Sequence, residues 1–167
     1  MPPDEIFEIV DENNNVIGTA RRSECHGNPK LIHRTAHVVV YSEDGKILLQ
    51  KRSKSKDIQP GKWDTAVGGH LMPGEDFETA ARREMAEELG IKKSVPLSFL
   101  FDMKIRNNIE SENVRVFSTV SSGPFSCPKE EIDEVKFWSI PDILNELENK
   151  SGTFTPNLLK ELKKLLL

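Results

Sequence analysis

The chain has 167 residues, of which 37% are hydrophobic and 30% charged, and its formal net charge is −4. A chain of this length is expected to form one domain, residues 1–167, with a substantial core. The acidic balance argues against a general nucleic-acid binder, because affinity for a phosphate backbone needs a concentrated basic surface. No apolar run approaches the roughly 18 residues of a membrane span, so we expect a soluble protein without membrane contact.

The two cysteines, Cys25 and Cys127, are too few for a disulfide framework. The N-terminal stretch MPPDEIFEIV lacks the charged and apolar regions of a signal peptide, so we expect a cytoplasmic location. Cys25 stands beside His26, which could suggest a thiol nucleophile. Neighbours in sequence are rarely partners in space, so we assign Cys25 no catalytic role.

The N-terminal third alternates apolar runs with turn-forming residues. The predicted elements are a hairpin over about residues 5–20 with strands at 6–10 and 16–20, a polar loop at 21–30, and strands at 35–42 and 46–51. An Asp-Gly pair joins the last two strands, so we expect them to form a hairpin at the centre of the sheet. A basic, turn-rich loop over residues 52–62 then leads to Trp63 and a further strand.

The C-terminal half continues with strands and closes with helices. The predicted elements are strands at 96–106 and 114–120 with a turn at Asn107 and Asn108, a strand at 132–138, and C-terminal helices within about 140–167, one ending near 149 and one at 155–167. Leucines form an apolar stripe on the last helix, which predicts packing on the core. Strands interrupted by one central helix and closed by C-terminal helices indicate a sheet covered on both faces.

Candidate chemistry is concentrated in residues 69–91, GHLMPGEDFETAARREMAEELGI, where a Gly/Pro loop precedes an acidic helix. Asp76 is the expected N-cap of this helix, because its side chain can accept a hydrogen bond from a free backbone N–H. Gly90 is the expected C-terminal stop. The expected core stripe of the helix consists of Ala81, Met85 and Leu89.

Three carboxylates, Glu84, Glu87 and Glu88, fall together on the neighbouring flank of this helix. Like charges at i and i+4 destabilise an isolated helix by roughly 0.2–0.5 kcal/mol, so a counter-charge is expected. Arg83 can supply part of it. A hard divalent cation would supply more, because Mg²⁺ prefers carboxylate and phosphate oxygens.

The same segment matches the Nudix box, G-x5-E-x7-R-E-U-x-E-E-x-G-U with U a bulky apolar residue, at every fixed position. The matching residues are Gly69, Glu75, Arg83, Glu84, Met85, Glu87, Glu88, Gly90 and Ile91. The chain therefore resembles the Nudix hydrolase superfamily. This resemblance implies an α/β fold, namely an α/β/α sandwich with a mixed β-sheet in which the box forms a loop–helix–loop.

The resemblance also implies an activity: metal-dependent hydrolysis of a diphosphate linkage in a nucleoside-diphosphate-type small molecule, with Mg²⁺ or Mn²⁺ as cofactor. Clustered carboxylates suit this reaction, because divalent cations neutralise phosphate oxygens and position the reacting groups. Carried over by position, the metal ligands are Glu84, Glu87, Glu88 and the carbonyl of Gly68, Arg83 orients the glutamates, Glu75 braces the loop, and the general base is Glu84, Glu87 or Glu112.

Residues 5–157 further resemble one branch of the superfamily, the isopentenyl-diphosphate isomerase-like proteins. The positions that match the metal site of the isomerase are His26, His33, His70, Glu110 and Glu112. Imidazoles combined with carboxylates suit Zn²⁺ or Mn²⁺, so these residues could hold a second, transition-metal ion. The alternatives are a structural role for His33 and a charged turn at Glu110 and Glu112. Arg52 and Lys56 match diphosphate-binding positions, which gives the basic loop an expected role.

Two departures favour a hydrolase over an isomerase. Gly68 stands where the isomerase has its essential cysteine, and Asn157 stands where it has a tryptophan that faces a carbocation. Isomerase-like activity is one alternative. A non-catalytic nucleotide-sensing module is another, although such a module would be expected to lose box glutamates. Nucleotide sugars, nucleoside di- and triphosphates and isoprenoid diphosphates all stay open as substrates, as does a homodimer through the exposed edge of the N-terminal hairpin.

Overall fold

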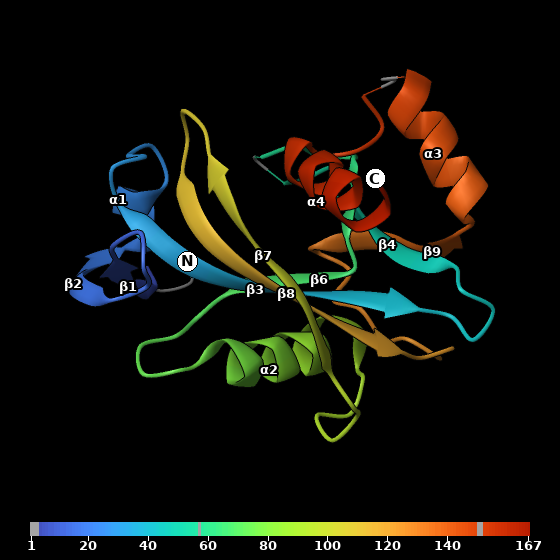
Figure 1. The fold of residues 1–167 in the computed structure, drawn as a ribbon, viewed down its shortest axis with the longest axis horizontal. Coiled ribbons are helices and arrows are strands. Elements are labelled where there is room, and N and C mark those ends of the chain that lie inside the picture. The colour runs from blue at the N-terminus through green and yellow to red at the C-terminus, as the bar shows by residue number, and fades with distance from the viewer. Residues whose placement is uncertain (1–3, 57, 150–151) are drawn as a thin grey trace.

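The computed structural model describes residues 4–56, 58–149 and 152–167. Within these residues the strands are β1 (Ile6–Val10), β2 (Val16–Arg21), β3 (Ile32–Tyr41), β4 (Ile47–Arg52), β5 (Trp63–Thr65), β6 (Val67–His70), β7 (Ser98–Arg106), β8 (Ser111–Val120) and β9 (Ile132–Trp138). The helices of the same residues are α1 (Arg22–Cys25), α2 (Phe77–Leu89), α3 (Ile140–Asn149) and α4 (Pro156–Leu166). The strands belong to one sheet, with α2 on one face and α3 and α4 on the other (Figure 1). The expected α/β/α arrangement is confirmed.

Strand β3 is the central strand of the sheet, because it pairs with other strands along both of its edges. One edge runs parallel to β8 over the full length of β3, and this pairing makes the sheet mixed. The other edge meets β1 at Ile32, β6 from Thr35 to Val38, and β4 at Tyr41. The hairpin expected between β3 and β4 has its turn, but the two strands pair only where Tyr41 faces Ile47. Strand β4 then diverges to pair with β5 and β9.

Two strands begin earlier than the sequence pattern predicted. Strand β3 starts at Ile32 instead of residue 35, and β8 starts at Ser111 instead of residue 114. Apart from Ile32, the added residues are polar and therefore did not look like strand residues. They pair with each other in the parallel register, so tertiary context overrides the local propensity.

Two further segments differ from expectation. The stretch expected to be a polar loop contains the short helix α1, whose Cys25 is fully buried against Phe7 and Ile9 of β1. The strand expected to lead into the box is divided into β5 and β6 by Ala66. This division matters for the site, because β5 pairs with β4 whereas β6 pairs with β3.

The core lies in two layers, one on each face of the sheet. On the α2 face, the fully buried Met85 and Leu89 pack with Val38 of β3. On the opposite face, Leu158 and Leu162 of α4 pack with other strand residues, including Trp63 and Val116. Complete burial of a side chain such as Leu or Met stabilises a fold by about 1.5–3 kcal/mol. The predicted core stripe of α2 is confirmed, since Ala81, Met85 and Leu89 are all 0% exposed.

The box helix α2 is fixed at both ends as expected. The Asp76 side chain accepts a hydrogen bond from the Thr79 backbone N–H at 2.7 Å, which is an N-cap. Gly90 adopts the left-handed conformation, with φ of 70°, and its N–H donates to the Ala86 carbonyl. A left-handed C-terminal residue is inexpensive only for glycine. These two ends set which side chains of α2 meet β6.

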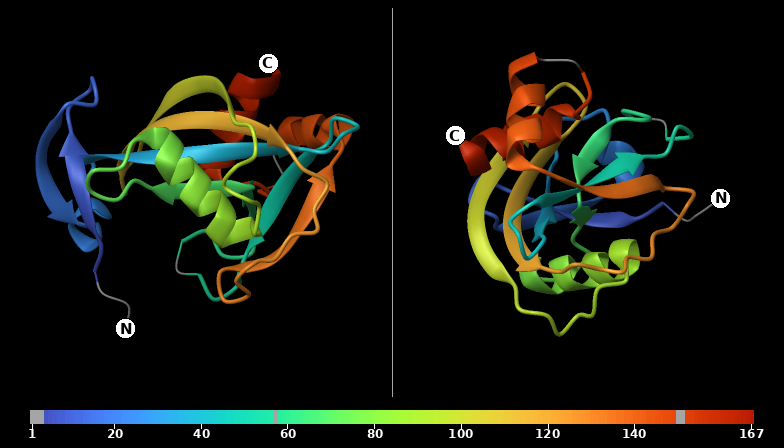
Figure 2. Two further views of the ribbon diagram at one scale, coloured as in Figure 1. Left: turned by 90° about the horizontal axis from the view of Figure 1, so that it is seen from below. Right: turned by 90° about the vertical axis from the view of Figure 1, so that its right-hand side faces the viewer.

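The N-terminal hairpin stands at one end of the sheet (Figure 2). Its strands β1 and β2 pair as expected, and β1 meets β3 where Val10 faces Ile32. Strand β2 lies at the end of the strand order, and its Val16 and Ile17 side chains are exposed. Among the described residues, none of the helices has both the length and the apolar character that crossing a membrane requires.

Candidate active site

Two adjacent glycines of β6 allow the acidic side chains of α2 to lie directly on the sheet. A Cβ atom at Gly69 would stand 2.2 Å from Cδ of Glu84, so only glycine leaves room for this carboxylate. The Gly68 backbone N–H donates a hydrogen bond to Oε2 of Glu88 at 3.1 Å. The close approach of Glu84 therefore explains why the first position of the box is a glycine.

Arg83 connects the box loop to the carboxylates of the helix. Its Nε and Nη2 atoms donate to the two oxygens of Glu75 at 2.8 Å and 2.9 Å. Its Nη1 atom lies 2.8 Å from Oε1 of Glu84 and 3.4 Å from Oε2 of Glu87. Nη2 also donates to the His70 carbonyl at 3.0 Å. The guanidinium thus holds β6, the loop and two box glutamates in one network, which fits the roles expected for Arg83 and Glu75.

Burial makes the negative charge of two box carboxylates energetically costly. Burial raises the pKa of Glu84 to about 7, against the lowering effect of Arg83. Burial, followed by the nearby charge of Glu84, raises the pKa of Glu88 well above its ordinary value. Glu87 is more exposed. A divalent cation would offset the cost of burying these charges, so the donor set fits Mg²⁺ or Mn²⁺. In the described part of the chain the three carboxylates do not by themselves form a compact cluster, because Arg83 stands between Glu84 and Glu87.

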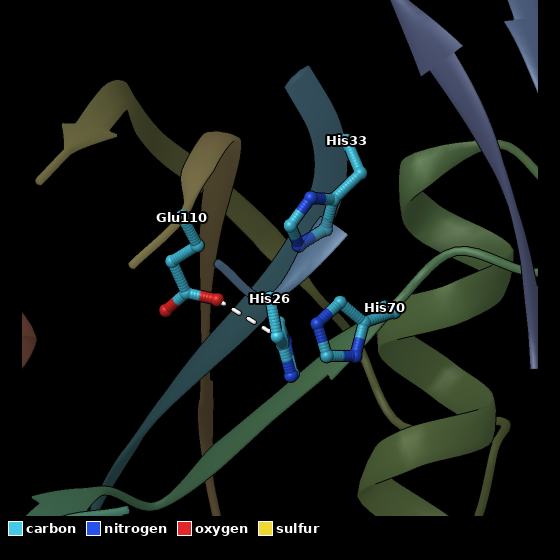
Figure 3. A group of neighbouring side chains, drawn as sticks. All are labelled: His26, His33, His70 and Glu110. Atoms are coloured by element: carbon cyan, nitrogen blue, oxygen red, sulfur yellow. Dashed lines mark ion pairs between the residues drawn. The ribbon is translucent and has the colours of Figure 1, made fainter. Parts of the chain in front are cut away.

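A second group of potential ligands gathers at the end of β3 nearest the N-terminal hairpin (Figure 3). We call it the histidine cluster, and its members are His26, His33, His70 and Glu110. One ligand atom from each residue lies within 4.8 Å of all the others. These residues come from four separate segments, and the structure brings them together at one place.

Buried polar atoms show that the histidine cluster fits a metal ion. Both ring nitrogens of His33 and the Nε2 atoms of His26 and His70 are buried and form no well-aligned hydrogen bond among the described residues, although each of the three Nε2 atoms lies 3.3–3.5 Å from a carboxylate oxygen of Glu110 or Glu112. An unsatisfied buried polar atom costs about 1–3 kcal/mol. A bound Zn²⁺ or Mn²⁺ would satisfy several of these atoms together, since imidazole is a common ligand of both.

Glu112 lies with the histidines and not with the box glutamates. Its Oε2 atom stands 3.3 Å from Nε2 of His33 and 3.5 Å from Nε2 of His70. Burial raises the pKa of Glu112, but the two imidazoles outweigh this effect and hold that pKa below its usual range. Burial also lowers the pKa of His70. Of the three residues expected as general base, Glu112 is therefore the one that lies beside the histidine cluster.

The predicted phosphate-binding residues stand at the end of β4 and in the loop after it. Arg52 donates from Nε to the Ile58 carbonyl at 3.0 Å, and its Nη1 atom lies 3.5 Å from Oδ2 of Asp64. Lys56 is half-buried, and its backbone N–H donates to the Ser53 carbonyl. The described part of the basic loop is therefore anchored to β4 and β5.

The sequence analysis missed a buried pair beside Gly68. His37 of β3 lies 2.8 Å from Glu161 of α4, measured from Nδ1 to Oε1. Burial lowers the pKa of His37, but Glu161 outweighs this effect and raises that pKa to about 9. A Cβ atom at Gly68 would come within 3.2 Å of the His37 ring. An isolated histidine in the apolar run AHVVVY was the available signal.

The cysteines give no sign of a nucleophile. Burial raises the pKa of the Cys25 thiol to about 11, and Cys127 is also a free cysteine with a raised pKa. The thiolate is the reactive form, so a raised pKa makes a thiol inert. This agrees with the sequence analysis, which gave Cys25 no catalytic role.

The box, the sheet and the helices around it are those of a known family. Residues 31–158 match the NUDIX domain, and the chain belongs to the Nudix hydrolase family. It is 43% identical over 166 residues to an uncharacterized Nudix hydrolase, YPO2781 of Yersinia pestis, covering 95% of this chain and 84% of that protein.

Two further comparisons bear on the fold and on the branch of the family. The crystal structure of DR0079 from Deinococcus radiodurans superposes with a TM-score of 0.84 at 20% identity, covering 98% of this chain and 100% of that chain. An isopentenyl-diphosphate Delta-isomerase of Streptomyces avermitilis is 41% identical over 90 residues, which is 54% of this chain and 46% of that protein. The first supports the fold, and the second is a partial likeness.

Proposed function

We propose that this chain is a metal-dependent diphosphohydrolase that cleaves a diphosphate linkage in a nucleoside-diphosphate-type small molecule. One observation carries the proposal: Glu84 packs against Gly69, and Glu88 accepts a hydrogen bond from the Gly68 backbone. Arg83 also donates to Glu84. Both carboxylates are costly to bury without a cation. Family membership supports a hydrolase, and the geometry supports these residues as its site.

The proposed metal ligands are Glu84, Glu87, Glu88 and the carbonyl of Gly68. Mg²⁺ or Mn²⁺ bound there would neutralise phosphate oxygens and lower the pKa of a bound water. Arg83 holds Glu84 and Glu87 in place, and Glu75 holds Arg83.

Substrate positioning falls to other residues of the chain. Arg52 and Lys56 bind the diphosphate, and Arg52 suits this task because a planar guanidinium can donate two parallel hydrogen bonds to a phosphate. Since Glu112 lies with the histidines, Glu84 and Glu87 are the candidates to accept the proton of the attacking water.

We also propose a transition-metal ion, Zn²⁺ or Mn²⁺, at the histidine cluster. Its ligands are His26, His33, His70 and Glu110, with Glu112 as a neighbouring carboxylate. The His70 carbonyl accepts from Arg83, so β6 connects this site to the box network. An ion there would fix the end of β6 that leads into the box loop.

The decisive experiment measures hydrolysis across a panel of diphosphate compounds, with phosphate or nucleoside monophosphate detected in Mg²⁺ and in Mn²⁺. Glu87→Gln and Glu88→Gln are expected to abolish turnover, because each removes a charged ligand with little change in shape. Glu78→Gln is the matched control, since Glu78 lies on the same helix and pairs only with Arg82 among the described residues. Equal turnover in the two box variants and the wild type would refute the assignment.

One alternative draws support from the histidine cluster and the partial likeness to an isomerase. Isomerase activity would require an acid–base group at the position of Gly68, where this chain has no side chain. Proton exchange into isopentenyl diphosphate above background would establish it. A non-catalytic nucleotide-sensing module would instead show tight nucleotide binding in the presence of metal and no turnover across the panel.

We also propose a setting for this activity. All nine strands of the described residues lie in one sheet, which supports treating residues 1–167 as one domain. Free cysteines favour the reducing cytoplasm. The open edge of β2 could pair with a second copy of the chain. Light scattering on the purified protein tests this homodimer.

A further inference from the structure

Asp64 occupies the junction between the basic loop and helix α4. Its Oδ1 atom accepts hydrogen bonds from the Thr65 backbone N–H at 2.8 Å and from the Thr155 hydroxyl at 3.1 Å. Its Oδ2 atom lies 3.5 Å from Nη1 of Arg52. Among the described residues, Oδ2 has no other hydrogen-bond partner. The two oxygens of Asp64 therefore serve different elements.

Arg52 is held from two sides, and among the described residues the rest of its guanidinium has no hydrogen-bond partner. Nε donates to the Ile58 carbonyl, and Nη1 points to Asp64. A guanidinium carries five N–H groups in a fixed fork, so the remaining donors on Nη1 and Nη2 are available for a ligand. The Arg52 side chain is 21% exposed, which allows a ligand to reach it.

We infer that Asp64 is a positioning residue: it fixes the guanidinium of Arg52 in the orientation that binds a diphosphate. The inference rests on the proposed function, in which Arg52 binds phosphate, and it adds the residue through which Arg52 is oriented. Holding Arg52 before the ligand arrives reduces the conformational entropy that binding would otherwise cost.

A purely structural role explains only half of the Asp64 side chain. Thr155 caps α4 by accepting from the Leu158 backbone N–H, and it needs one acceptor for its own hydroxyl proton. Oδ1 fulfils that need. Burial raises the pKa of Asp64, so an ionised carboxylate is costly at this position, and a neutral amide would serve Thr155 equally well. The second oxygen, Oδ2, is left to contact Arg52.

Asp64→Asn separates the two roles. The amide oxygen can still accept from Thr65 and Thr155, whereas the amide nitrogen would face the donors of Arg52. The substitution therefore removes one contact and keeps the cap of α4. Thr155→Val is the complementary variant, because it removes the hydroxyl that caps α4 and leaves Arg52 and Asp64 in place.

The experiment measures binding of methylenediphosphonate, a diphosphate analogue that cannot be hydrolysed, by isothermal titration calorimetry of the full chain in Mg²⁺. The variants are Arg52→Ala, Asp64→Asn, the double variant and Thr155→Val, each with its melting temperature. We expect Asp64→Asn to weaken binding about tenfold, which is typical for loss of a charge-assisted contact. In the Arg52→Ala background, Asp64→Asn should change the affinity by less than about twofold, because the effect passes through Arg52. Thr155→Val should lower the melting temperature and leave the affinity within about twofold.

Three results would overturn the inference, and they are distinguishable. Wild-type affinity in Asp64→Asn, together with weakened binding in Arg52→Ala, would leave the phosphate role of Arg52 standing and remove the role of Asp64. If Asp64→Asn weakens binding by the same factor in the wild type and in the Arg52→Ala background, its effect does not pass through Arg52. That result, or an equal loss of affinity in Thr155→Val, would show that Asp64 acts through α4. Wild-type affinity in Arg52→Ala would remove the phosphate role of Arg52, and the inference with it, while hydrolysis by the box glutamates would remain to be judged by Glu87→Gln.

Discussion

Replacing Gly69 by alanine tests whether the seating of Glu84 on the sheet is needed for activity. The added methyl carbon would lie 2.2 Å from Cδ, 2.4 Å from Cγ and 2.5 Å from Oε1 of Glu84. Ordinary contacts between carbon atoms are about 3.5–4.0 Å, so the carboxylate must move by more than about 1 Å. The backbone itself accepts alanine, because Gly69 is not among the glycines with positive φ.

Gly69→Ala should reduce the activity far more than it reduces the stability of the fold. Glu84 is the flexible partner in the clash, and rotating it away from Arg83 costs of order 0.5–1.5 kcal/mol, the range for an unfavourable side-chain torsion. Misplacing a catalytic group by about 1 Å can cost about 100-fold in rate, or about 2.7 kcal/mol of transition-state stabilisation. We therefore expect kcat/KM to fall about 100-fold, with a melting temperature close to that of the wild type.

The assay compares hydrolysis of the best substrate in the panel, together with Mn²⁺ affinity by calorimetry, in Gly69→Ala and in a matched control. Gly18→Ala is that control, because a Cβ at Gly18 would meet nothing within 4 Å and its φ is not positive. It should leave the rate and the metal affinity unchanged. Wild-type kcat/KM in Gly69→Ala would refute the reasoning, since it would mean that Glu84 works from a position other than the one against β6.

Two further predictions concern pH and metal. Because the pKa of His37 is raised from 6.5 to about 9, its protonated form stabilises the folded chain fully below about pH 6.5, and this contribution of at most about 3 kcal/mol is lost as the pH rises through about 9. Urea unfolding should accordingly show the wild type losing stability between about pH 7 and about pH 10 more steeply than Glu161→Gln, and parallel curves would contradict the pairing. For the histidine cluster, His33→Ala should lower the Zn²⁺ content measured by mass spectrometry by about one ion per chain, whereas Glu78→Gln should not; the same content in both variants would exclude this site.

The box could be predicted from the sequence because its determinants are local. Asp76, Gly90 and the buried stripe through Met85 lie within or beside one helix, so caps and periodicity were sufficient. The spacing of the motif identified both Gly69 and Glu84. The reason for the glycine, which is the close approach of Glu84, is visible only in the structure. The histidine cluster followed from resemblance and not from periodicity, because its members come from separate segments.

The contacts of α4 could not be predicted in the same way. Glu161 and His37 are 124 residues apart, and Thr155 and Asp64 are 91 apart. Only the pairing of the sheet brings α4 against β3 and β5. The early starts of β3 and β8 were missed for the same reason. Their first residues, which are mostly polar, form strands because they pair with each other. Local pattern describes one element at a time, and these features belong to pairs of elements.

The position of β3 has a consequence for how the protein tolerates changes in length. His33 and His37 lie on one side of this strand, and Val38 lies on the other, against α2. Side chains alternate along a strand, so deleting a single residue near its start would exchange the two sets at once. The imidazoles would be pressed into the apolar layer, while aliphatic groups would replace them beside Glu112 and Glu161. Within this part of the chain, insertions and deletions should therefore be tolerated in the turns that border β3 and not in the strand itself.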